Sequence, residues 1–164
     1  MKRHFLLWTC YLFLTGITAG LVAFCLTGAI HLIQTLSFGF KQGSFSTMIA
    51  SIPPYRRAIS LVLAGLLAGV GWHWLAKKGK VIQSIQQTLH DNTLFSPWTQ
   101  FWHGWLQLTT VSMGAPVGRE GASREVAVAM TSLWSQKCNL SKKDQKLLLA
   151  CASGAVSYTH LTLP

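Results

Sequence analysis

Residues 114–122 have the sequence GAPVGREGA, in which a proline and three glycines surround Arg119 and Glu120. Proline and glycine interrupt helices, so a preceding helix is expected to end here and a new one to begin near Arg119. The first backbone N–H groups of a helix lack partners within the helix, and the helix dipole is positive at that end. Because Gly118 and Gly121 carry no side chain that blocks an approaching ion, the stretch predicts an anion site at a helix N-terminus.

Glu120 has two interpretations. As a gate, its carboxylate competes with the anion for the same N–H donors, so protonating or displacing it frees the site. As a structural residue, it stabilises the positive end of the helix dipole and pairs with Arg124 four positions later. Spacing alone favours the structural interpretation, whereas a membrane setting favours the gate, because ionisable residues inside membranes are usually functional.

The composition of the 164-residue chain favours a membrane setting. Only 11% of its residues are charged, against about 25% in soluble domains. Residues 5–40 contain no Lys, Arg, Asp or Glu, and neither do residues 58–76, so both runs are long enough to cross a bilayer as helices. A signal peptide is the alternative for the first run, but that run continues far beyond the usual apolar core of about 15 residues.

The basic residues lie at the ends of these apolar runs. The chain has 14 Lys and Arg against 4 Asp and Glu, and the basic clusters are Lys2 with Arg3, Arg56 with Arg57, Lys77–Lys80 and Lys142–Lys146. This placement is typical of membrane proteins, in which positive segments stay on the cytoplasmic side. We therefore expect the lipid bilayer and no nucleic acid as a partner, with the N-terminus and residues 77–80 in the cytoplasm.

The second half of the chain predicts shorter helices. Residues 81–92 predict a short helix, and Pro97–Met113 predicts a semi-polar helix buried among other helices. Two apolar pieces, residues 126–134 and 147–156, are too short to cross a bilayer alone, and Ser141 with Asp144 fits a capping box at the start of the last helix. Short helices at membrane depth persist where they line a cavity or pack inside protein, which favours a transporter or channel.

Other residue classes predict packing rather than chemistry. Glycines one turn apart are expected to pack helices closely, and they are Gly16 with Gly20 and Gly65 with Gly69. The cysteines form no CxxC pair and are expected to be small buried hydrophobes; they are Cys10, Cys25, Cys138 and Cys151. The six histidines are scattered without a metal-binding spacing, so no metal site, cofactor or enzymatic activity is expected.

Residues 118–121, Gly-Arg-Glu-Gly, resemble the G-R-E-G-P motif of the CLC family of chloride channels and proton/chloride antiporters. Residues 150–157, ACASGAVS, resemble the small-residue helix that follows in that family, and the resemblance extends over about residues 5–157. It implies an all-α, multi-pass membrane fold with broken and tilted helices, of which residues 1–157 form the N-terminal part.

The same resemblance implies a function. It implies transport of chloride or a similar small anion across the inner membrane, by a channel or by proton-coupled antiport, in a homodimer with a pore in each subunit. Glu120 would be the external gate and, in an antiporter, a proton carrier, with Gly118, Arg119 and Gly121 around the anion. The chain has too few spans to enclose a pore, so residues 1–164 alone are expected to carry no anion flux.

The chain departs from the family pattern at three places. Ala122 stands where the motif has its proline. The family's G-S-G-I-P loop falls near residues 79–83, but Lys80 occupies the position of the anion-coordinating serine, either as a cationic lure for anions or as a solvated anchor. Residues 158–164 do not resemble the family, and foreign sequence at a truncation point is one interpretation of this tail.

A second function from another class stays open at this stage. A membrane anchor or assembly subunit that transports nothing would use Glu120 and Arg124 only as a structural ion pair. The choice between channel and antiporter is open as well, because the family's internal proton glutamate and pore tyrosine lie beyond residue 157.

Overall fold

The computed structural model describes residues 2–39, 52–77, 96–116, 118–138 and 140–159, and within these ranges it is all-helical. The helices are α1 (Lys2–Phe38), α3 (Pro54–Lys77), α5 (Pro97–Ser112), α6 (Arg119–Lys137) and α7 (Lys142–Thr159). The expected all-α class is confirmed. Lys80 and the helix predicted over residues 81–92 lie outside the described residues.

Helices α1 and α3 are the two long apolar elements. The segments Leu6–Phe38 and Pro54–Lys77 are long and apolar enough to cross a membrane, as the charge-free runs predict. Pro54 occupies the first position of α3, where a missing N–H costs no helical hydrogen bond. Near this end the two helices are joined, because Arg56 Nε donates a hydrogen bond of 3.2 Å to the carbonyl of Ser37.

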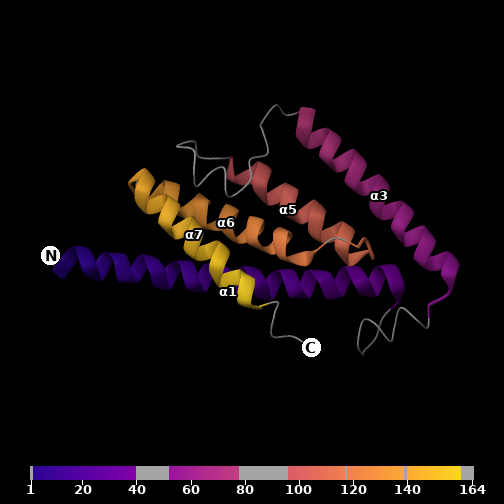
Figure 1. Cartoon of the computed structure of the whole chain (residues 1–164), viewed down its shortest axis with the longest axis horizontal. Coiled ribbons are helices and arrows are strands. Elements are labelled where there is room, and N and C mark those ends of the chain that lie inside the picture. The colour runs from indigo at the N-terminus through magenta and orange to yellow at the C-terminus, as the bar shows by residue number, and fades with distance from the viewer. Residues whose placement is uncertain (1, 40–51, 78–95, 117, 139, 160–164) are drawn as a thin grey trace.

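Helices α5, α6 and α7 form the compact part of the molecule. In Figure 1, α5 and α6 lie above α1, α7 crosses α1, and α3 lies on the far side of α5. α6 packs against both α5 and α7, and α1 contacts all three. The core between them consists of Ala19, Val22, Leu26 and Ile30 of α1 with Leu108, Ala122, Val126, Ala127 and Val156.

The boundaries of α6 and α7 differ from those suggested by hydrophobicity. The apolar pieces at 126–134 and 147–156 proved to be parts of helices of 19 and 18 residues. The helices extend over polar sequence because its charged groups are exposed or paired there and its hydroxyl groups bond to the backbone. Ser123 Oγ donates to the Glu120 carbonyl, and the N–H of Asp144 donates to Ser141 Oγ at 3.2 Å. The predicted cap at Ser141 is therefore confirmed.

Two packing predictions are wrong for contacts among the residues that the structure describes. A Cβ added to Gly16, Gly20, Gly65 or Gly69 would meet no atom within 4 Å. All four cysteines, Cys10 and Cys25 of α1 among them, are exposed rather than buried. Hydrophobicity and small size mark a residue that can be buried, but they do not say which side of a helix another helix covers. In α1 and α3 these residues lie on faces that carry exposed apolar side chains such as Phe24 and Leu66.

Candidate anion site at the start of helix α6

The turn between α5 and α6 is held in place by three helices. α5 ends at Ser112, and Gly114 has φ +102°, a conformation that a residue with a Cβ rarely adopts. The Ser60 hydroxyl of α3 donates a buried hydrogen bond of 2.9 Å to the Met113 carbonyl. Phe38 of α1 lies against Gly114 on another side, 3.4 Å from where a Cβ would stand. The turn therefore presents α6 from a fixed position.

The N-terminus of α6 is open. The helix begins at Arg119, as predicted, and its N-cap residue Gly118 provides no side-chain hydrogen bond to the first turn. Apart from its two chain neighbours, no described residue has an atom within 4 Å of the position where a Cβ of Gly118 would be, and both Gly118 and Glu120 are exposed. The first N–H groups of a helix have no intrahelical partner. An anion can therefore approach these donors without displacing a capping side chain.

Four of the five predicted site residues lie together in the structure. Gly118, Arg119, Glu120 and Gly121 share the first turn of α6 or its cap, although the described atoms do not include the Arg119 side chain. Gly121 has an additional packing role, because a Cβ there would lie 3.1 Å from Gln107 Nε2 of α5. Lys80 lies outside the described residues, so its place relative to this turn stays a prediction.

Glu120 and Arg124 form the ion pair that their spacing suggested. Arg124 Nη2 lies 3.2 Å from Glu120 Oε2, and the side chains are 39% and 53% exposed. An exposed pair of this kind contributes about 0.3–0.5 kcal/mol, which is comparable to thermal energy. The ion pair therefore forms, but its energy is too small to fix the position of the Glu120 carboxylate.

A second pair at this site was not anticipated from the sequence. His103 Nδ1 of α5 lies 2.5 Å from Glu125 Oε2 of α6, with only 21% and 18% of the side chains exposed. The indole of Trp72 of α3 lies against the imidazole, with ring centroids 6.0 Å apart. His103 and Glu125 can be recognised in the sequence as polar residues. They are 22 residues apart, however, and no helical period predicts a contact over that separation.

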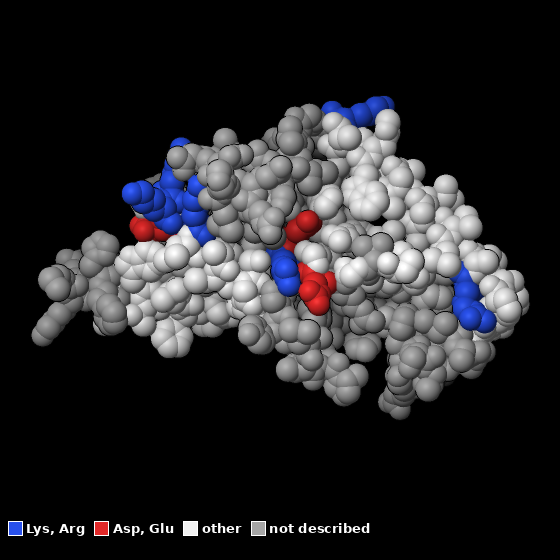
Figure 2. Space-filling view, viewed as in Figure 1, with Lys and Arg blue, Asp and Glu red and all other residues white. Residues whose placement is uncertain are grey.

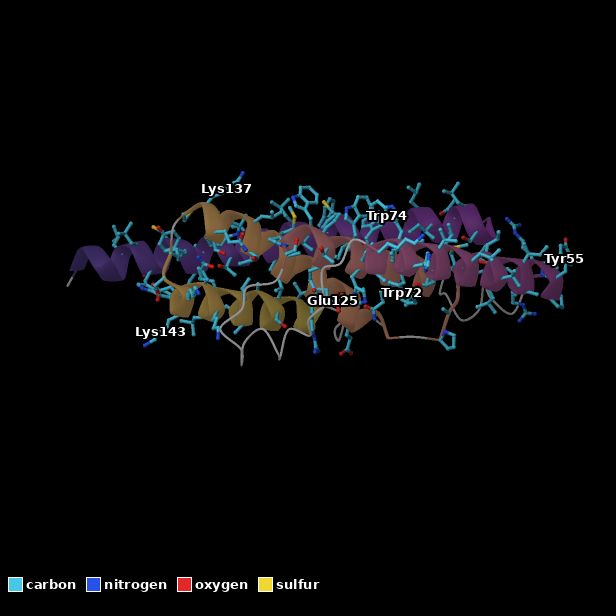
Figure 3. The ribbon with its side chains drawn as sticks, turned by 90° about the horizontal axis from the view of Figure 1, so that it is seen from above. Tyr55, Trp72, Trp74, Glu125, Lys137 and Lys143 are labelled. Carbon is cyan, nitrogen blue, oxygen red and sulfur yellow. The ribbon has the colours of Figure 1, made fainter. Side chains whose placement is uncertain are left out.

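The start of α6 carries three charged residues within six positions, Glu120, Arg124 and Glu125. Figure 2 shows one small group of acidic and basic atoms near the middle of the drawn face and a larger group toward its left edge. In Figure 3, Glu125 and Trp72 are likewise near the middle, whereas Lys137 and Lys143 lie toward one end and Tyr55 at the other. Ionisable groups inside a helical bundle are costly unless they serve a function or are paired.

Two apolar spans and a charged helix start, with the turn before it in contact with both spans, are features of a helical membrane protein. Residues 64–156 match the model of the family described as voltage gated chloride channel. This region is more than half of the chain and includes the whole of α5 and α6. The chain therefore belongs to the voltage-gated chloride channel family, which confirms the resemblance carried by residues 118–121.

Curated relatives agree with this membership. The chain is 27% identical over 154 residues to the voltage-gated ClC-type chloride channel ClcB of Citrobacter koseri, which covers 90% of this chain and 37% of the relative. It is 26% identical over 151 residues to ClcB of an Escherichia coli strain, covering 88% of this chain and 36% of the relative. The chain thus spans little more than a third of the length of these relatives. No solved structure matches it.

Proposed function

We propose that this chain forms part of a protein that moves chloride or a similar small anion across a membrane, with the anion bound at the N-terminus of α6 and Glu120 as its gate. The observation that carries the proposal is an acidic side chain, 53% exposed, in the first turn of a helix whose N-cap is a glycine. The names of the curated relatives, chloride channels, support the same substrate class.

The proposed gate works by competition for hydrogen-bond donors. A carboxylate in the first turn and a small anion are both attracted to the same N–H groups and the same positive end of the dipole. Protonation removes the charge of Glu120 and therefore its advantage in that competition. The contact with Arg124 opposes this movement only weakly, because both side chains of the pair are exposed.

Both a channel and a proton-coupled antiporter fit this scheme. In an antiporter the proton that neutralises Glu120 is also the transported proton, whereas in a channel it only opens the path. We propose further that the full-length protein is a homodimer in the bacterial inner membrane, as the family resemblance implies, and that its action is transport rather than catalysis.

The orientation in the membrane is proposed from the flanking charges. Lys2, Arg3 and residues 77–80 are expected on the cytoplasmic side, so that α1 runs outward and α3 returns. Single cysteines at positions 2 and 78 check this in intact cells with a membrane-impermeant thiol reagent. The wild-type thiols are replaced first, and labelling of position 78 from outside would reverse the assignment.

The gate is tested by Glu120→Gln in the full-length protein reconstituted into liposomes. The neutral amide imitates the protonated state, so anion flux is expected to persist or rise while its dependence on external pH largely disappears. Any proton coupling should disappear with it. The matched control is Arg124→Gln, which breaks the same ion pair but keeps the carboxylate, and it should retain the pH dependence.

The observed ion pair also favours a second candidate, a membrane anchor in which Glu120 and Arg124 are purely structural. That function predicts no selective anion flux from the full-length protein. It also predicts that the two substitutions have equal, small effects on stability, about 0.3–1 kcal/mol for the loss of the first-turn charge. A wild-type pH profile in the Glu120→Gln protein would remove Glu120 from the mechanism.

A further inference from the structure

The pair between His103 and Glu125 is the most enclosed charged contact that the structure describes. Its two atoms are 2.5 Å apart, and each side chain is less than a quarter exposed. By contrast, the Glu120–Arg124 pair on the same helix is far more exposed. A carboxylate removed from water is costly unless a partner compensates its charge, so Glu125 depends on His103 in a way that Glu120 does not depend on Arg124.

The pair lies beside a close approach of α5 and α6. A Cβ on Gly104, the residue after His103, would stand 3.0 Å from the Ala122 carbonyl and 2.9 Å from a methyl group of Val126. A Cβ there would also be 3.2 Å from Cβ of Glu125. The missing side chain of Gly104 thus permits the approach that brings the imidazole to the carboxylate.

The indole of Trp72, on α3, packs against the imidazole of His103 and brings no charge of its own to the pair, with ring centroids 6.0 Å apart. On α6 the nearest other ionisable side chains in sequence, Glu120 and Arg124, are paired with each other. α1 has no Lys, Arg, Asp or Glu from residue 5 to 39, and its His31 is exposed.

Most titratable groups of the remaining elements lie toward the ends of their helices. On α3, Arg56 and Arg57 belong to the first turn and Lys77 to the last. His73 follows Trp72, whose ring contacts His103, but the side chain of His73 is exposed. On α7 the charged residues Lys142, Lys143, Asp144 and Lys146 belong to its start, beside the far end of α6. His103 is therefore the described group that is placed to compensate Glu125.

Glu125 is close enough to the start of α6 for its charge to act on an anion there. It follows Glu120 by five positions, an axial rise of about 7.5 Å in an α-helix. A bare carboxylate at about 10 Å in a partly shielded protein environment lowers the affinity for a monovalent anion by about tenfold. A proton shared with His103 cancels that charge, so that Glu120, paired with Arg124, is the carboxylate that remains near the start of α6.

We propose that His103 neutralises Glu125, and that this neutralisation is required for a small anion to bind at the N-terminus of α6. His103 is thus a positioning residue that acts through Glu125 and does not touch the anion. The inference rests on the proposed anion site. The inference holds whether or not Glu120 acts as the gate.

The test is a double-mutant cycle in the full-length protein, with chloride affinity measured by calorimetry at mildly acidic pH, about 6, where free carboxylates are ionised and free imidazoles are largely protonated. His103→Gln is expected to weaken chloride binding about tenfold, because it leaves the carboxylate uncompensated. Glu125→Gln should bind within about threefold of the wild type, and the double variant His103→Gln/Glu125→Gln should recover the affinity lost by His103→Gln. His31→Gln, which removes an exposed imidazole from α1, is the matched control and should bind like the wild type.

The cycle distinguishes an effect of the Glu125 charge on anion binding from a structural effect of the contact between α5 and α6. If the pair serves only to join α5 and α6, the double variant binds as weakly as His103→Gln or more weakly, and the proposal is overturned. Unchanged affinity in His103→Gln overturns it as well. If His103→Gln does not fold, Glu125→Gln decides alone, because a tenfold loss there would mean that the carboxylate itself is needed. Absence of chloride binding in the wild type would instead remove the proposed anion site on which the inference rests.

Discussion

The molecule has two regions that expose and bury different kinds of side chain. Helices α1 and α3 form one region, and helices α5 to α7 form the other. The first two are long and apolar and expose large side chains such as Phe13 and Val70, at 70% and 71%. The other three bury small and polar residues, and Ala122, Ala127, Thr131 and Ser135 are completely buried on α6. Hydrophobicity marks the helices that can face lipid, whereas small residues mark the helices that pack closely enough to hold a polar site.

Among the substitutions that test this comparison, the largest loss of stability is expected at Gly104. Leu in its place would collide with the Ala122 carbonyl and Val126 and force α5 and α6 apart. We expect Gly104→Leu to lower the free energy of unfolding by about 1–3 kcal/mol, as in other overpacked cores, and to reduce anion flux. Thermal unfolding in detergent and liposome flux measure the two effects.

The matched control for Gly104 is Gly65→Leu on α3, where no atom lies within 4 Å of the added Cβ. Little loss of stability is expected there. An equal loss at both positions would break the comparison, because it would mean that parts of the protein outside the described residues cover that face of α3.

A medium effect is expected at Ser60, which makes one of the contacts between the two regions. Its hydroxyl is buried and donates to the Met113 carbonyl at 2.9 Å, so Ser60→Ala leaves a buried carbonyl without this partner. The expected cost is about 1–3 kcal/mol in the free energy of unfolding, measured by denaturation. Thr18→Ala removes an exposed hydrogen bond within α1 and should cost less. Equal costs would show that Ser60 does not anchor the turn.

The smallest effect is expected at Arg124. Because the pair with Glu120 is exposed, Arg124→Gln should lower the free energy of unfolding by no more than about 0.5 kcal/mol. The same denaturation measurement decides. A loss above about 1 kcal/mol would place Arg124 among the structural residues of the α5–α7 bundle.

The sequence by itself determined the two long spans, the start of α6 at Arg119, the cap at Ser141, the Glu120–Arg124 pair and, through residues 118–121, the family. All of these depend on neighbours along the chain, because helix breaks, caps and pairs four residues apart follow from local geometry. Only the tertiary structure decided which faces are covered, so the burial expected for Cys10 and Cys25 and the packing expected at Gly16 and Gly65 were wrong within this chain. It also brought His103 to Glu125 across 22 residues, since a contact between two helices depends on how closely they approach, and here a single missing side chain at Gly104 sets that approach.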